Sequence, residues 1–147
     1  MRELLIDGID EGYLRKAWHG PTLRGALRGV TLAQALWRPS KDRHNIWELT
    51  LHCAYWKYAV RRRLTRERRG SFARPGSNWL ALPKPTPQAW RADLQLLADE
   101  HRALRGAVQS LPAARVERAV RLIRGIAYHD VYHAGQIQLL KRLAVDR

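Results

Sequence analysis

The apolar residues of this chain recur at intervals of three and four, which is the period of an amphipathic α-helix. Two stretches, from about 88 to 109 and from about 113 or 115 to 143, carry continuous apolar stripes at this spacing. The stripes consist of Trp90, Leu94, Leu97, His101, Leu104 and Val108, and of Leu122, Ile126, His129, His133, Ile137 and Leu140. The alternating pattern of a half-buried strand is weak throughout. The period therefore predicts an all-α fold.

Two further helical stretches come earlier in the chain. The first covers about residues 2 to 17, and a longer one covers about residues 44 to 66. Asn45 or Asp42 would cap the longer helix, because both side chains accept hydrogen bonds from the first free N–H groups of a helix. Between them, residues 21 to 36 are expected to form one or two short helical turns.

Residues 69 to 88 interrupt the helical pattern with four prolines and two glycines. Proline removes a backbone donor and breaks a helix, so this segment is expected to be a long loop. A loop of this length in a small domain is more often functional or disordered than idle. We therefore predict a four-helix bundle in one domain, residues 1–147, with a short extra helical segment after the first helix and a long loop between the second and third.

Composition limits the class of protein. The single cysteine, Cys53, excludes an intrachain disulfide and is compatible with a reducing compartment. No apolar run approaches the roughly 20 residues that a membrane span needs, and the early acidic residues Glu3, Asp7 and Asp10 argue against a secretory signal. We expect a cytoplasmic protein without a membrane partner. The net charge of +14 indicates either a bias toward arginine on solvated surfaces or an anionic partner.

Three histidines are the strongest candidates for chemistry. His129 and His133 are four residues apart, so both lie on one face of a helix and can chelate one metal ion. His52 lies in the middle of another long helix, and it would complete a three-histidine site with open coordination positions, as in catalytic metal centres. Neutral imidazoles suit zinc, nickel, iron and copper ions without choosing among them.

The sequence around these histidines resembles a known family. Residues 45–56, NIWELTLHCAYW, and 129–137, HDVYHAGQI, look like the two signature segments of the DinB/YfiT-like superfamily. The segments WHGP at 18–21 and WRP at 37–39 are similar to one branch of it. The resemblance covers most of the chain and is weakest in the loop 69–88.

The resemblance implies a four-helix bundle with a three-histidine metal site, whose ligands by position are His52, His129 and His133. It also implies the chemistry of a family that includes thiol transferases using bacillithiol or mycothiol, and a maleylpyruvate isomerase using mycothiol. Many members have no known reaction.

Several residues near the three histidines in the sequence could support the metal site. Glu48 and Gln136 lie about one turn from a ligand and could orient a ligand or a bound water, although Glu48 is also well placed as a helix N-terminal carboxylate. His101 could be a fourth ligand or a pocket base, but a hydrogen-bonded core histidine is the favoured interpretation. Asp130 points away from His129 and is expected in an ion pair, and Cys53 is expected to be a small buried side chain.

The leading hypothesis is a metal-dependent enzyme that holds one divalent zinc, nickel, iron or manganese ion and transfers a low-molecular-weight thiol such as bacillithiol to a small-molecule substrate. Hydrolysis at the same site is an alternative. A third is a basic nucleic-acid-binding protein with a structural metal, for which the six arginines in residues 61–69 are the candidate. That stretch lacks a base-reading motif, so we expect no sequence-specific nucleic-acid binding. A homodimer is compatible with a bundle of this size.

Overall fold

The computed structural model describes residues 1–145 and confirms the all-α prediction. It contains six α-helices and no β-sheet in that part of the chain. They are α1 Arg2–Tyr13, α2 Leu23–Leu27, α3 Leu32–Leu36, α4 Ile46–Thr65, α5 Pro87–Ser110 and α6 Ala113–Val145. Residues 146 and 147, the end of the predicted domain, lie outside the described part. None of these helices is both long and apolar enough to cross a membrane.

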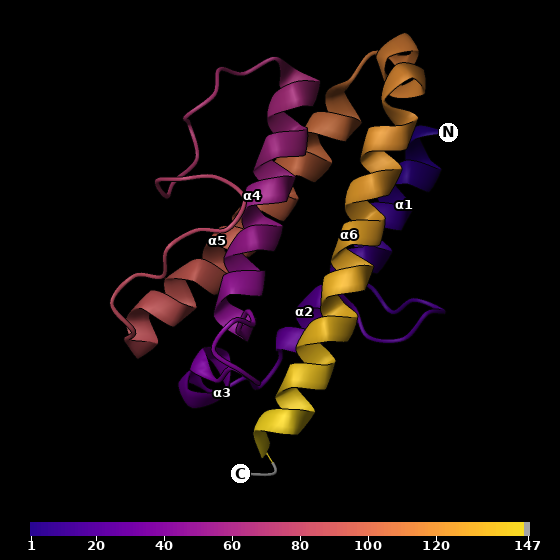
Figure 1. Ribbon diagram of the computed structural model, residues 1–147. Helices are drawn as coiled ribbons and strands as arrows, with labels where there is room; N and C mark the ends of the chain where they lie inside the picture. Colours follow the sequence, from indigo (N-terminus) through magenta and orange to yellow (C-terminus); the bar gives the residue numbers. More distant parts are fainter. Residues whose placement is uncertain (146–147) are drawn as a thin grey trace.

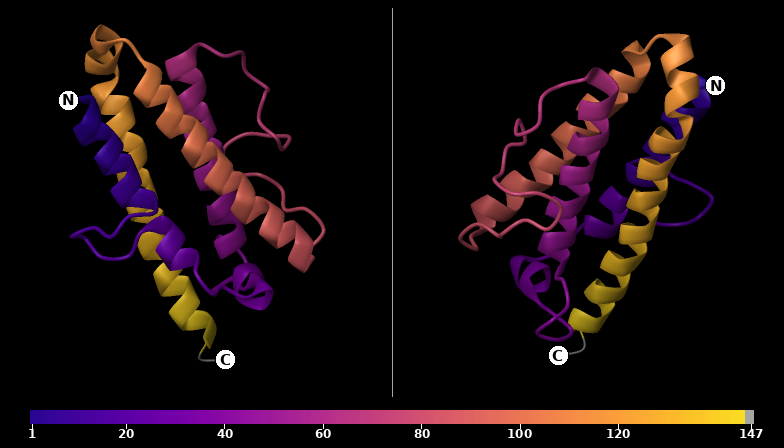
Figure 2. Two further views of the ribbon diagram at one scale, coloured as in Figure 1. Left: turned by 180° about the vertical axis from the view of Figure 1, so that it is seen from behind. Right: turned by 45° about the horizontal axis from the view of Figure 1, so that its top comes forward.

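Four of the helices enclose the core. Helix α4 packs against α5 and α6, and α1 packs against the same two helices, so the contacts form a closed ring. In Figure 1, α4 and α6 lie side by side in front and run in opposite directions. Figure 2 shows α1 along the upper half of α6 and α5 along α4 when the molecule is seen from behind. The short helices α2 and α3 pack against α6 and α4 at the lower end.

Polar side chains fix where the helices begin. Asn45, not Asp42, caps α4: its side chain accepts from the Glu48 N–H, and Glu48 accepts from the Asn45 N–H in return. This reciprocal capping box satisfies two otherwise free donors. Helix α5 begins with Thr86 as its cap and Pro87 in its first turn, where the missing N–H of proline costs nothing.

The first helix is shorter than predicted. It ends at Tyr13, because the carbonyl of Asp10 accepts the N–H groups of both Leu14 and Arg15 and the regular ladder stops there. The Arg15 guanidinium also folds back to the Asp7 carboxylate. Ala17, at the end of the predicted stretch, lies instead in the loop that leads to α2.

The core consists of two apolar clusters stacked along the bundle. One gathers around Trp47, Leu97 and Ile137 at the end that holds α2 and α3. The other gathers around Ile9, Leu104 and Ile123 at the opposite end. A group of buried polar residues, which includes Asp10, Lys57, His101 and Asp130, lies between the two clusters on α1, α4, α5 and α6. This polar zone positions the candidate site.

Two glycines of α1 provide a test of the α1–α6 packing. A Cβ added at Gly12 would lie 2.9 Å from the backbone oxygen of Ala127, whereas one added at Gly8 would meet nothing within 4 Å. We expect Gly12→Ala to destabilise the protein, because α1 must move away from α6. Gly8→Ala should instead stabilise it by about 0.5–1 kcal/mol, the gain of alanine over glycine in a helix. Urea unfolding of both variants measures the difference, and equal effects would contradict the close packing.

Candidate metal centre

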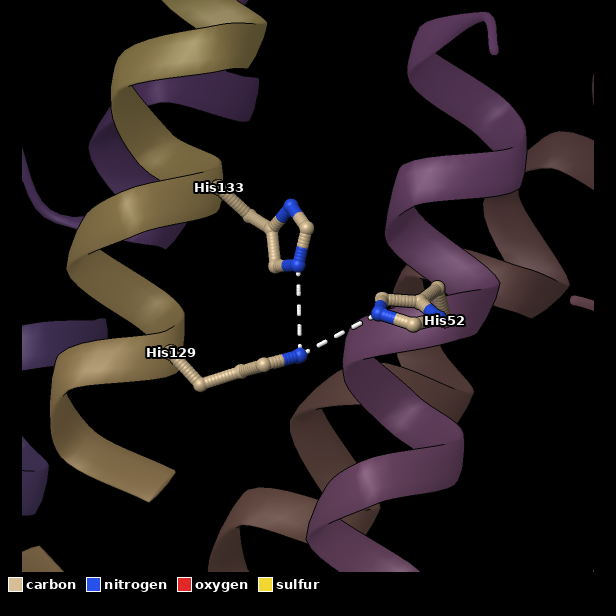
Figure 3. A group of neighbouring side chains, drawn as sticks. All are labelled: His52, His129 and His133. Atoms are coloured by element: carbon tan, nitrogen blue, oxygen red, sulfur yellow. Dashed lines mark hydrogen bonds between the residues drawn. The ribbon is translucent and has the colours of Figure 1, made fainter. Parts of the chain in front are cut away.

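The three predicted ligands come together between α4 and α6. His52 lies on the second turn of α4, and His129 and His133 lie on successive turns of α6. The Nε2 atom of His129 is 3.2 Å from Nε2 of His52 and 3.2 Å from Nε2 of His133. Figure 3 shows all three rings pointing into the space between the two helices. One candidate ligand atom from each ring lies within 4.8 Å of the others.

Hydrogen bonds identify which nitrogens of two rings carry lone pairs. The Nδ1 atom of His52 is 3.1 Å from the carbonyl oxygen of Asn78, which can only accept, so Nδ1 is the protonated nitrogen. The Nδ1 atom of His133 is 2.6 Å from Oε1 of Gln136 and donates in the same way. The Nε2 atoms of both rings therefore present lone pairs to His129. Because Nε2 of His129 carries at most one hydrogen, it cannot satisfy both contacts.

A cation resolves this arrangement. Imidazole nitrogens bound tetrahedrally to zinc at 2.0–2.1 Å lie about 3.3 Å apart, close to the two separations of 3.2 Å at His129. Burial lowers the pKa of His52 to about 4 and that of His129 to about 3, and it also lowers the pKa of His133. All three rings are thus neutral at pH 7, as metal binding requires. The triad fits one divalent ion and could hold it.

The long loop, residues 66–86 in the structure, forms one wall of the triad. The Trp79 ring lies stacked between His52 and His44, with ring centroids 3.8 Å and 3.6 Å away, and its edge-on neighbour is His133. Asn78 has a left-handed backbone with φ of 62°, and its side-chain oxygen accepts from the Trp56 indole N–H at 2.9 Å. The same residue thus orients His52 through its carbonyl and anchors the loop to α4.

Of the predicted supporting groups, Gln136 contacts a ligand and Glu48 does not. The Gln136 side chain accepts from His133 and donates to the Tyr132 hydroxyl at 3.3 Å. Such an acceptor fixes the tautomer and the orientation of a ligand ring. Glu48 instead accepts from Arg38 at 2.6 and 2.7 Å, besides its capping role and a contact to His44. The carboxylate therefore acts at the start of α4, which is the helix N-terminal role that was also predicted from the sequence.

His101 belongs to a separate buried network. Its Nε2 atom lies 3.2 Å from Asp10, its Nδ1 atom lies 3.4 Å from the ammonium of Lys57, and Lys57 forms an ion pair with Asp130. These four residues, here called the polar layer, come one each from α1, α5, α4 and α6. Burial lowers the pKa of His101 to about 3, which keeps it neutral as an acceptor from Lys57. His101 is thus a hydrogen-bonded core residue and lies outside the triad.

A second group of possible ligands, Cys53, His129 and Asp130, is less suited to a metal. Burial raises the pKa of the Cys53 thiol well above its usual range, so the thiol stays protonated and packs as a small apolar side chain, as predicted. Asp130 is fully buried and already paired with the ammonium of Lys57, in agreement with the expected ion pair between helices. His129 is therefore assigned to the triad.

Comparison with known proteins identifies the family. A family model described as the DinB superfamily matches residues 14–137. The chain belongs to the DinB superfamily. Comparisons with curated proteins and with solved structures found no match. The matched range contains all three histidines of the triad, and it confirms the resemblance seen in the two signature segments.

Two residues that shape the site were missed in the sequence. Lys57 is a fully buried lysine. Its position one residue after Trp56, on a helix rich in cations, gave no signal that it faces the core. Asn78 lies in the long loop, for which the sequence predicted no contact with the histidines. The available signal was a tryptophan within a long polar loop, because such a side chain favours packing of the loop against the helices.

The arginine stretch 61–69 is partly engaged within the protein. Arg61 contacts Glu100 at 3.1 Å and Glu67 at 2.6 Å. The helix ends inside the stretch, where Arg66 adopts a left-handed backbone with φ of 63°. These features are those of a helix end tied to its neighbours.

The triad predicts that the protein holds one divalent ion per chain. His129→Ala removes the ring that contacts both others, so we expect the ion to be lost while helix content persists. His101→Gln removes a buried histidine that lies outside the triad, so occupancy should stay near that of the wild type. Elemental analysis after purification without chelators or metal-affinity columns measures both. Full metal occupancy in His129→Ala would show that the ion binds outside the triad.

The polar layer predicts an uneven response to removing carboxylate charges. Asp130→Asn leaves the buried Lys57 ammonium without its counter-charge, so we expect a loss of about 3–5 kcal/mol in the free energy of unfolding. Asp99→Asn breaks an exposed pair with Arg102 and should cost less than about 1 kcal/mol. Chemical denaturation compares the two variants. A small effect at Asp130 would mean that Lys57 is not held by this ion pair.

Proposed function

We propose that this protein is a metal-dependent enzyme that transfers a low-molecular-weight thiol, such as bacillithiol, to an electrophilic small molecule. The observation that carries the proposal is the set of three Nε2 atoms that converge from two helices and leave coordination positions open. A divalent ion held there supplies a position at which a thiol loses its proton near neutral pH.

Cavities adjoin the triad along the α4–α6 interface. His129 lines a cavity of about 410 Å³, beside the later turns of α4 and the earlier turns of α6. His133 lines another of about 660 Å³, with Trp79, Tyr132 and Leu139 on its walls. Both volumes lie in the range of small-molecule sites. Two cavities that adjoin different ligands of one triad suit a reaction between two small molecules.

The surroundings of the triad favour thiol transfer over hydrolysis. A hydrolase that activates water at a metal usually employs a nearby carboxylate as a general base. Among residues 1–145, the two carboxylates closest in sequence to the ligands are committed elsewhere, Asp130 to Lys57 and Glu48 to Arg38. A bound thiolate is already a nucleophile and needs no such base.

The test uses protein loaded separately with zinc, nickel, iron and manganese. Each form is mixed with bacillithiol, mycothiol, glutathione or cysteine and with an aryl halide, in which a carbon–sulfur bond replaces the carbon–halogen bond and halide and a proton are released. We expect metal-dependent formation of the thioether, detected by mass spectrometry, with at least one thiol. His129→Ala should reduce the rate to the uncatalysed level.

A parallel assay with activated esters distinguishes the hydrolytic alternative. Metal-dependent ester hydrolysis without thiol transfer would overturn the proposal in favour of a hydrolase. Transfer that continues unchanged in His129→Ala would show that the triad is not the reactive centre.

A further inference from the structure

The cavity that adjoins His129 is a groove between α4 and α6, here called the arginine groove. Trp56, Val60 and Arg63 line it from α4, at positions i, i+4 and i+7 on one helix face. On the α6 side the groove is lined by residues 118, 121, 122, 125 and 126. These residues lie on the same helix face as His129. The groove therefore runs along the bundle and ends at a metal ligand.

The groove combines an apolar floor with a cationic rim. Val60, Leu122 and Ile126 line it together with the Trp56 ring, and the Arg63 guanidinium lies 6.0 Å from the centre of that ring. Arg118 and Arg121 project from successive turns of α6 and are exposed. About 12 Å of helix separate Arg121 from His129, at 1.5 Å per residue. An extended small molecule can thus reach from the rim to the triad.

The three rim arginines differ from many other arginines of the chain. Arg38, Arg61 and Arg74 each pair with a carboxylate of the protein. No such pair is found for the rim arginines, Arg63, Arg118 and Arg121, within the described residues 1–145. Three like charges around one cavity repel each other, and an anion placed between them relieves that repulsion. Guanidinium groups bind carboxylates by two parallel hydrogen bonds.

We propose that the arginine groove binds the carboxylates of the thiol cosubstrate, so that the cosubstrate is a small thiol with at least two carboxylates. The carboxylates lie at the arginine rim, the chain lies along the apolar floor, and the sulfur reaches the open side of the triad. The volume of about 410 Å³ accommodates a small molecule rather than a polymer. The inference rests on the proposed function, because it assigns a charge to the thiol used there.

The first experiment compares two small thiols on cobalt-loaded protein. Mercaptosuccinate carries two carboxylates and thioglycerol carries none, and thiolate binding to cobalt is followed by its charge-transfer absorption. We expect mercaptosuccinate to bind more tightly, and the double variant Arg118→Gln/Arg121→Gln to weaken it at least about tenfold, which corresponds to about 1.4 kcal/mol. Thioglycerol binding should change less than about twofold. Metal content is measured after each titration.

A matched double variant controls for the change in net charge. Arg28 and Arg91 are exposed and line a different cavity, which holds none of the three triad histidines. Arg28→Gln/Arg91→Gln removes the same two charges and should leave mercaptosuccinate binding unchanged. An equal loss in this control would show that overall charge, not the groove, attracts the anion.

Gly125 offers a steric test that keeps every arginine. It lines the groove, and a Cβ added there meets nothing within 4 Å. The Cβ of Gly125→Leu is therefore placed without a clash, and we expect the side chain to fill part of the cavity and weaken mercaptosuccinate binding. Gly106→Leu introduces the same side chain at a similarly open glycine of α5 and should leave binding intact. Unchanged affinity in Gly125→Leu would place the ligand outside the groove.

Calorimetry on metal-free protein separates this inference from the proposed function. Benzylsuccinate, a dicarboxylate with an apolar ring and no thiol, should bind the wild type and lose affinity in Arg118→Gln/Arg121→Gln. If benzylsuccinate binds in this way but the protein holds no metal, the groove is an anion-binding site and the proposed function is wrong. If metal and thioglycerol bind but the arginine variants change no affinity, the groove does not bind the carboxylates, whereas the metal site is supported.

Discussion

The polar layer is the constraint on which the rest of the structure depends. One residue from each of the four enclosing helices joins the chain of contacts from Asp10 through His101 and Lys57 to Asp130. A buried charge without a partner is costly, so the helices are held in the one register that pairs these groups. Since Asp130 directly follows His129, the register that satisfies Lys57 also turns His129 toward α4. The apolar contacts of the two clusters are non-directional and would tolerate small shifts between helices that the paired charges do not.

The long loop gives the site a wall that the helices alone lack. Its asparagine carbonyl sets the tautomer of His52, and its tryptophan covers the same ring by stacking. The left-handed backbone at Asn78 suits asparagine, which adopts that conformation more readily than most residues. A segment with too much proline and glycine for a regular element can therefore be well placed, because a few side chains tie it to the bundle. The site is built from two helices and one loop.

The helices and the triad were largely predictable because both depend on local periodicity. The spacing of four between His129 and His133, and the place of His52 within another long helical stretch, already indicated that three imidazoles lie on apolar faces. Side-chain chemistry limited the cap of α4 to Asn45 or Asp42, and the structure shows that it is Asn45. Contacts between distant segments were not accessible in this way: nothing local shows that Lys57 meets Asp130, or that Asn78 meets His52. In the same way, nothing local shows that Glu48 pairs with Arg38, which lies in the loop between α3 and α4.

The placement of the triad has a consequence for the cohesion of the whole molecule. The most extensive helix contacts are those of α4 with α5 and of α1 with α6, so the triad joins one helix from each of these pairs. His52 and His129 are 77 residues apart in the chain. An ion held by both acts as a removable cross-link that closes a long segment, and the entropy of closing such a segment grows only slowly with its length. Releasing the ion and parting the two halves would then be one coupled equilibrium, so that anything that loosens the α4–α6 contact also loosens the grip on the metal.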